Sequence, residues 1–91
     1  MNDKDKKPKR KDNLTAQDLG DEIILYDPEK ENVHVLNHTA QAIWNLCTGE
    51  NSLEDIHKSL IKLFPNAPEN ELLNDLQSTI NDLKLKNIIN C

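Results

Sequence analysis

Between Leu25 and Trp44, the spacing of the apolar residues changes from that of a β-strand to that of an α-helix. Residues 23–26 form a β-prone run, and a proline-containing turn connects them to a second apolar run at residues 33–36. Together the two runs predict a β-hairpin. Apolar residues then recur at i, i+3, i+4 and i+7, which predicts a helix whose inner face carries Ala40, Ile43, Trp44 and Cys47. Any fold of this chain must therefore let a hairpin arm continue directly into a helix.

The flanking segments extend this pattern on both sides. Residues 13–19 contain a weak strand signal, and a turn at Gly20-Asp21 would let this strand pair with the hairpin. After the first helix, capped by Asn37, a second helix starts at Ser52 with a capping-box pattern and ends before Pro65. A third is predicted from about Pro68 to Lys86, with Ala67 as its N-cap. The expected fold is α+β and winged-helix-like, with a three-stranded antiparallel sheet followed by three helices.

The chain has one residue of each aromatic type, and all three are expected to lie in the core. Tyr26, together with Ile43 and Trp44, should lock the hairpin to the helices. We also expect Cys47 to be a small buried hydrophobe. Ile88 and Ile89, after the third helix, should fold back onto the core.

Charge is distributed unevenly along the chain. Residues 1–12 hold six cationic and three acidic side chains, a net charge of +3, whereas residues 13–91 hold five lysines and 13 acids, a net charge of −8. With no apolar residue after Met1, the first segment is expected to be a disordered basic arm, and residues 13–91 to form the domain. An acidic domain repels phosphate backbones, so we do not expect nucleic acid as the main partner.

Several other classes of protein are disfavoured by the sequence. No apolar stretch approaches the roughly 20 residues needed to cross a bilayer, so a cytoplasmic protein without membrane contact is expected. No nucleophile with a base, no glycine-rich phosphate loop and no clustered metal ligands are recognisable. His34 and His38 are four residues apart but fall on a strand and at a helix start, which disfavours a metal site. We therefore expect neither an enzyme nor a bound cofactor.

The chain also resembles a known family over nearly everything after residue 13. The matching segments are Leu25-Tyr26-Asp27-Pro28-Glu29, Val35-Leu36-Asn37-His38-Thr39-Ala40, Ile43-Trp44, Gly49-Glu50, Ser52-Leu53-Glu54-Asp55-Ile56, Pro68-Glu69 and residues 83–89. They are similar to the PqqD-like proteins, small peptide chaperones first named from pyrroloquinoline quinone biosynthesis, whose domain is also called the RiPP recognition element. Two positions depart from the family pattern: Asn87 stands where a glycine is usual, and Ala67 where an aspartate is frequent.

This resemblance implies a non-catalytic protein that binds the leader segment of a ribosomally made precursor peptide and presents it to a modifying enzyme, commonly a radical-SAM enzyme. In the family, the leader lies as an added strand against the third strand, in a groove that the third helix completes. Carried over to this chain, the backbone contacts fall at Asn32, Val33, His34, Val35 and Leu36. The side-chain contacts fall at Leu76, Thr79, Ile80 and Leu83. Lys84 and Lys86 could attract acidic leader residues or, equally, stabilise the C-terminal end of their helix.

Two other interpretations use the same sequence features. The helices could belong to a winged-helix DNA-binding or transcription-adaptor protein, but residues 68–86 carry four acids against two lysines, which would repel a major groove. An open strand edge could also join two copies of the chain, so a monomer or a weak dimer is expected.

Overall fold

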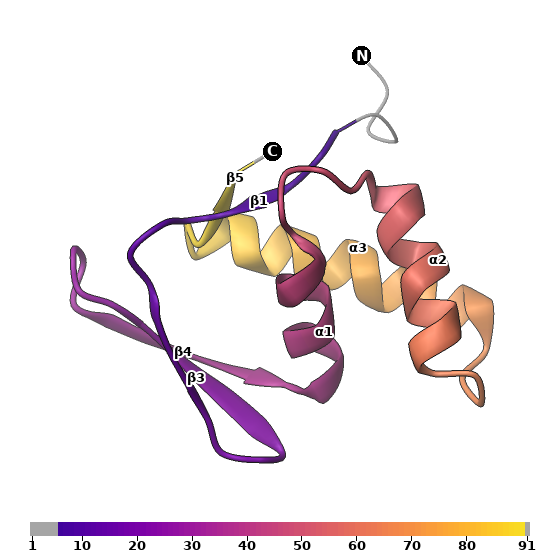
Figure 1. Cartoon of the computed structure of the whole chain (residues 1–91), viewed down its shortest axis with the longest axis horizontal. Coiled ribbons are helices and arrows are strands. Elements are labelled where there is room, and N and C mark those ends of the chain that lie inside the picture. The colour runs from indigo at the N-terminus through magenta and orange to yellow at the C-terminus, as the bar shows by residue number, and fades with distance from the viewer. Residues whose placement is uncertain (1–5, 91) are drawn as a thin grey trace.

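The computed structural model describes residues 6–90, and it has the expected α+β order of a three-stranded antiparallel sheet followed by three helices (Figure 1). The strands are β1 (Lys9–Arg10), β2 (Thr15–Asp18), β3 (Glu22–Asp27), β4 (Asn32–Asn37) and β5 (Ile89–Asn90). The helices are α1 (His38–Leu46), α2 (Leu53–Leu63) and α3 (Glu69–Leu85). Within the described residues, no helix is long and apolar enough to cross a membrane.

The main sheet has the strand order β2-β3-β4, and both pairs are antiparallel. A two-residue turn at Gly20-Asp21 joins β2 to β3, and Gly20 adopts the left-handed φ of 95° that such a tight turn needs. Figure 1 shows the hairpin projecting away from the helices, with β4 running straight into α1. The change of apolar spacing in the sequence therefore marks the β4–α1 junction.

The inner face of the sheet carries Ile23, Leu25 and Leu36, which are buried against α1 and the rest of the core. Ile43 and Trp44 of α1 are buried there as expected. The expectation for Tyr26 was wrong, because side chains alternate along a strand and Tyr26 lies on the outer face, where it is 40% exposed. Leu25, its neighbour in sequence, provides the buried contact instead.

Side-chain caps fix where α1 and α2 begin. Asn37 accepts a hydrogen bond from the Ala40 N–H (2.9 Å) at the start of α1. At α2 the predicted capping box is complete, since Asp55 N–H donates to Ser52 Oγ and Ser52 N–H donates to the Asp55 carboxylate. The third helix starts one residue later than predicted. Pro68, rather than Ala67, is its N-cap, and no side chain caps it.

The C-terminal end of α3 closes in a Schellman motif. Asn87 adopts a left-handed φ of 58°, its N–H donates to the Lys84 carbonyl (2.9 Å), and the Ile88 N–H donates to the Leu83 carbonyl (3.1 Å). The chain then turns back, so that Ile88 and Ile89 are buried in the core as expected.

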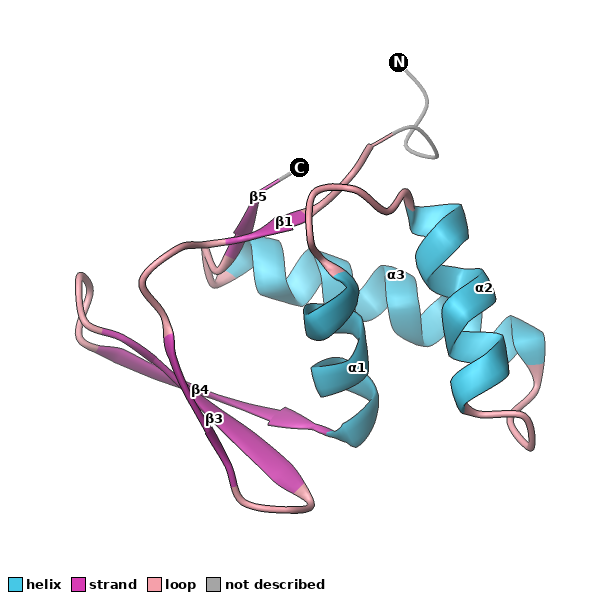
Figure 2. Cartoon of the chain, in the orientation of Figure 1, coloured by secondary structure: helices cyan, strands magenta, loops and turns pink. Residues whose placement is uncertain are grey.

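The segment just before the main sheet packs against the domain, which differs from the disordered arm predicted for residues 1–12. β1 pairs with β5, as Figure 2 shows near the two ends of the chain. Pro8 is fully buried, and its carbonyl accepts from the Gly49 N–H (3.0 Å). Arg10 donates its N–H to the Cys47 carbonyl (2.8 Å) and lies 5.0 Å from the centre of the Trp44 ring. Composition alone does not reveal these contacts, because backbone groups and one cation–π contact make them. Residues 1–5 of the predicted arm lie outside the described part of the chain.

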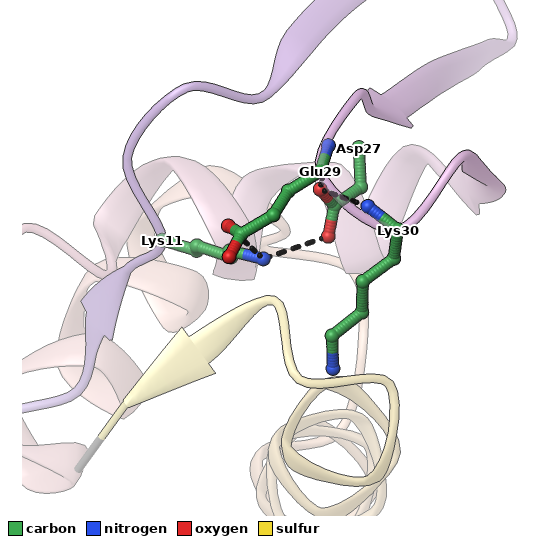
Figure 3. A network of polar contacts seen from close by, with 4 residues as sticks. All are labelled: Lys11, Asp27, Glu29 and Lys30. Atoms are coloured by element: carbon green, nitrogen blue, oxygen red, sulfur yellow. Dashed lines mark hydrogen bonds and ion pairs between the residues drawn. The ribbon is translucent and has the colours of Figure 1, made fainter.

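A network around Asp27 ties the same segment to the hairpin (Figure 3). Asp27 is only 1% exposed, and its carboxylate accepts from Lys11 Nζ (2.9 Å) and from the Glu29 and Lys30 N–H groups. The hydrogen bond from Lys11 is the main cause that lowers the pKa of Asp27, whereas burial opposes it. Lys11 also pairs with the exposed Glu29 (3.3 Å). The turn between β3 and β4 is therefore anchored to the segment around β1.

Candidate functional site

One edge of β4 is unpaired in the described part of the chain. Leu19 N–H donates to the Glu22 carbonyl (2.8 Å), so the backbone polar groups of Glu22 face β2, and successive residues of an antiparallel strand face opposite neighbours. The β3 residues that face β4 are then Ile23, Leu25 and Asp27, and their partners in register are Leu36, His34 and Asn32. It follows that Val33 and Val35 direct their N–H and C=O groups away from β3, toward the open edge.

A groove of about 370 Å³ lies beside this edge. One wall is formed by the end of β4 and the start of α1, and the other wall by α3. The lining residues are Val35, Leu36, Asn37, Thr39 and Ala40 on the first wall, and Asp75, Ser78, Thr79 and Asp82 on the second. The third helix thus stands where the sequence analysis expected it to complete a groove.

The five residues of the predicted β4 contact set, Asn32–Leu36, point their backbone N–H and C=O groups in two different directions. Val33 and Val35 combine edge-facing backbone groups with side chains on the outer face of the sheet, where they are 60% and 51% exposed. Asn32, His34 and Leu36 direct their backbone groups to β3. Leu36 is also buried in the core. Two of the five predicted residues therefore present hydrogen-bonding groups at the open edge.

The predicted α3 contact residues lie partly in the groove and partly in the core. Thr79 lines the groove, but Leu76, Ile80 and Leu83 are buried in the hydrophobic core and take no part in its lining. The helix face that carries Leu76, Ile80 and Leu83 packs into the core, where α3 contacts α1, α2 and β5. A peptide in the groove would meet polar α3 side chains instead.

The two predicted cations also lie elsewhere. Lys84 is exposed and follows Asp75 by nine residues, which at 3.6 residues per turn places it about 180° around the helix from the groove. Lys86 Nζ forms an ion pair with the Asp82 carboxylate (2.9 Å). Neither lysine lines the groove. The structure therefore gives no support to a cationic α3 wall.

Six groove-lining residues were not predicted from the sequence: on the first wall Asn37, Thr39 and Ala40, and on the α3 wall Asp75, Ser78 and Asp82. With Thr79, the three α3 residues recur at i, i+3, i+4 and i+7, the spacing of a single helix face. Ordinary solvent-exposed helix faces show the same spacing of polar residues. The pattern therefore indicates a groove wall only when the position of α3 opposite β4 is known.

His34 contributes to the inner side of β4 near the C-terminal end of α3. Its side chain is half-buried, and its Nε2 has no hydrogen-bond partner within the described residues. Burial is the main cause that lowers the pKa of His34, and the charge of Lys86 acts in the same direction. Both effects favour the neutral form of the imidazole. Residues 6–90 contain no group of three or more His, Cys, Asp or Glu side chains that could hold a metal ion.

Comparison with known proteins agrees with this architecture. The family model of coenzyme PQQ synthesis protein D (PqqD) matches residues 22–89. The solved structure "TbiB1 in Complex with the TbiA(beta) Leader Peptide" superposes with a TM-score of 0.74 at 18% sequence identity, over 89% of this chain and 93% of that one. A comparison with curated proteins finds no significant match. Because the family model covers β3, β4 and all three helices, this chain belongs to the PqqD family.

Proposed function

We propose that this protein is a non-catalytic peptide chaperone, which binds the leader segment of a ribosomally synthesised precursor peptide and presents it to a modifying enzyme. The leader adds a strand to the open edge of β4. The observation that carries the proposal is this edge, which is unpaired within residues 6–90, lies between β3 and α1 and faces a groove. Membership of the PqqD family supports it, as does the fold shared with TbiB1, whose solved structure contains a leader peptide.

The chemistry of such binding follows from the edge. Val33 and Val35 each offer one N–H donor and one C=O acceptor, and hydrogen bonds to these groups do not depend on the peptide's side chains. Selection among peptides then falls to the groove, where every second side chain of an added strand meets α3. This arrangement suits a protein that must hold a peptide firmly without altering it.

The partner enzyme in this proposal belongs to the radical-SAM class, and the complex forms in the cytoplasm, where the precursor is synthesised. The chaperone acts as a monomer or a weak dimer, since a second copy paired at β4 would compete with the leader for the same edge. A short open reading frame and a radical-SAM gene beside this gene would identify both partners.

The test is a titration of ¹⁵N-labelled protein with a synthetic leader from the precursor encoded beside its gene. We expect amide shifts at residues 33–37 of β4 and at residues 75–82 of α3. Shifts confined to residues 6–12 would contradict the proposal, because the peptide would then bind to the basic segment and not to β4. Size-exclusion chromatography with and without peptide separates leader binding from pairing of two protein copies.

A further inference from the structure

The groove beside β4 carries negative charge on its α3 wall, and this charge affects which leader peptides can bind. Its nine lining residues include two carboxylates, Asp75 and Asp82, and no lysine or arginine. Lys86 lies one turn beyond Asp82 and neutralises it through the 2.9 Å ion pair. Asp75 has no ion-pair partner among residues 6–90. One full negative charge on the α3 wall is therefore left without a partner.

The start of α1 also borders the groove, and its positive helix end partly opposes this charge. A helix N-terminus acts as roughly half a positive elementary charge. In addition, the side chain of Asn37 already occupies the Ala40 N–H (2.9 Å), so one donor at that helix end is used. Half a charge does not cancel a full carboxylate, and the groove remains negative.

We propose that the leader segment bound by this protein carries a lysine or arginine that enters the groove and pairs with Asp75. This inference rests on the proposed function. The hydroxyl groups of Ser78 and Thr79 lie on the same wall and can accept further hydrogen bonds from an ammonium or guanidinium group. A leader with an acidic residue at the same position meets Asp75 with like charge and binds more weakly, the opposite of what cations at Lys84 and Lys86 would have favoured.

The experiment uses three synthetic nonapeptides of alternating valine and threonine, with a central lysine, glutamine or glutamate. Each is flanked by proline, which limits pairing between peptides. Titrations of the ¹⁵N-labelled protein should show the lysine peptide binding at least about threefold more tightly than the glutamate peptide, with glutamine between them. The shifts should fall in β4 and in residues 75–82 of α3.

Three variants locate the source of the preference. Asp75→Asn should abolish it, whereas Asp75→Glu, which keeps the charge, should retain it. Glu54→Gln changes the net charge by the same amount at an exposed position on α2, and it should leave the preference intact. Thermal unfolding of each variant checks that the fold is kept.

Two results would overturn the inference alone: equal binding of the lysine and glutamate peptides at β4, or an equal loss of preference in Asp75→Asn and Glu54→Gln. The second result would assign the preference to the acidic domain as a whole. If no peptide, including a genuine leader, perturbs β4, the proposed function fails and the inference fails with it.

Discussion

Asp27 is the residue on which the geometry of the hairpin turn depends. A carboxylate that is 1% exposed is tolerated because each of its oxygens has a donor, Lys11 Nζ on one side and the Glu29 and Lys30 N–H groups on the other. The two backbone bonds hold the turn, and the lysine ties it to the segment before β2. One side chain therefore joins parts of the chain sixteen residues apart.

Replacing Lys11 by methionine should lower the stability of the protein in a pH-dependent way. The pKa of Asp27 is lowered from 3.8 and that of Lys11 is raised from 10.5, in each case mainly by the hydrogen bond between them. A lowered acid pKa contributes stability above pH 3.8 that is lost as the pH falls further. The raised lysine pKa contributes stability below pH 10.5 that is lost at higher pH. Urea unfolding should show the largest difference from wild type between these limits.

The matched control is Lys58→Met, which removes an exposed ion pair with Glu54 one helical turn away. It should change stability less than Lys11→Met at neutral pH. A difference between Lys11→Met and wild type that stayed constant down to pH 2 would contradict the role assigned to Asp27.

Asn87 gives a second prediction for a single residue. Its φ of 58° is readily adopted by glycine and asparagine but strains a β-branched residue. Asn87→Gly should leave the free energy of unfolding within about 0.5 kcal/mol of wild type, because easier access to this conformation is offset by greater freedom of the unfolded chain. Asn87→Val should lower it by about 1–2 kcal/mol. Asn66→Val, at an exposed turn residue whose φ is not positive, serves as the control; equal effects at both sites would rule out backbone strain as the cause.

At the scale of elements, β4 combines two roles that place opposite demands on a strand. Its inner side is fixed by pairing with β3 and by the burial of Leu36. Its outer edge is open and carries the donors and acceptors that a peptide needs. Direct continuation into α1, with Asn37 as the cap, holds the edge in place at one end, and the Asp27 network holds the turn at the other.

Proline substitutions at two strand edges separate these roles. Val35→Pro removes an N–H that faces the open edge and the groove, whereas Ala16→Pro removes an N–H on the opposite edge of the sheet, because Ala16 of β2 faces away from β3 by the same alternation. Prolines at outward-facing edge positions leave the internal ladders intact. We expect Val35→Pro to weaken leader binding about tenfold and Ala16→Pro to leave it unchanged, as measured by titration. Equal effects of the two variants would mean that the peptide does not pair with β4.

The elements of this fold were largely predictable from the sequence, but the faces of its strands were not. The hairpin, the capped helices and the return of Ile88 follow from local patterns that act within a few residues. Residues 23–26 are all apolar and show no alternation, so the pattern cannot say which of them point inward. That choice is set by Asp27, which must share the inner face because its partner, Lys11, lies there. A contact between residues this far apart in sequence leaves no periodic signal.

The candidate site was predictable only in part, for a related reason. The edge of β4 follows from strand order, but the sequence named all five residues 32–36 as contacts and could not separate Val33 and Val35, which face the edge, from the other three. The α3 wall was not, because an apolar stripe such as Leu76, Ile80 and Leu83 has the same spacing whether it meets the core or a ligand. In a chain of 91 residues the core takes all of it, and the neighbouring polar stripe faces the groove.

At the scale of the whole molecule, the two ends of α1 face different partners. Its N-terminal end borders the groove through Thr39 and Ala40, whereas its C-terminal end contacts the segment around β1 through Cys47. The segment around β1 also pairs with β5, so it joins the start and the end of the described chain (Figure 1). The packing of the β1 segment at the C-terminal end of α1 and peptide binding at its N-terminal end can therefore be tested separately.

Removal of residues 1–11 should lower stability without removing the groove. The truncation deletes the hydrogen bonds from Arg10 to Cys47, from Lys11 to Ile88 and from Gly49 to Pro8. It also deletes the cation–π contact on Trp44 and the bond from the Lys11 side chain to Asp27. These five contacts, less the entropy of ordering the segment, correspond to a loss of about 1–3 kcal/mol. Urea unfolding followed through the fluorescence of Trp44, the chain's one tryptophan, measures this loss, and the native emission should shift to longer wavelength as the ring loses its cover.

Removal of residues 1–5 alone leaves all five contacts in place and serves as the matched control for the longer truncation. Leader affinity, measured under conditions where both truncated proteins are folded, should match that of the full chain, because none of residues 6–11 lines the groove. A truncated protein that lacks residues 1–11 yet keeps its full stability would show that β1 adds no net stability. A loss of leader affinity in the folded truncated protein would instead show that the segment around β1, through α1 or through the Lys11–Asp27 pair, positions the groove as well as closing the core.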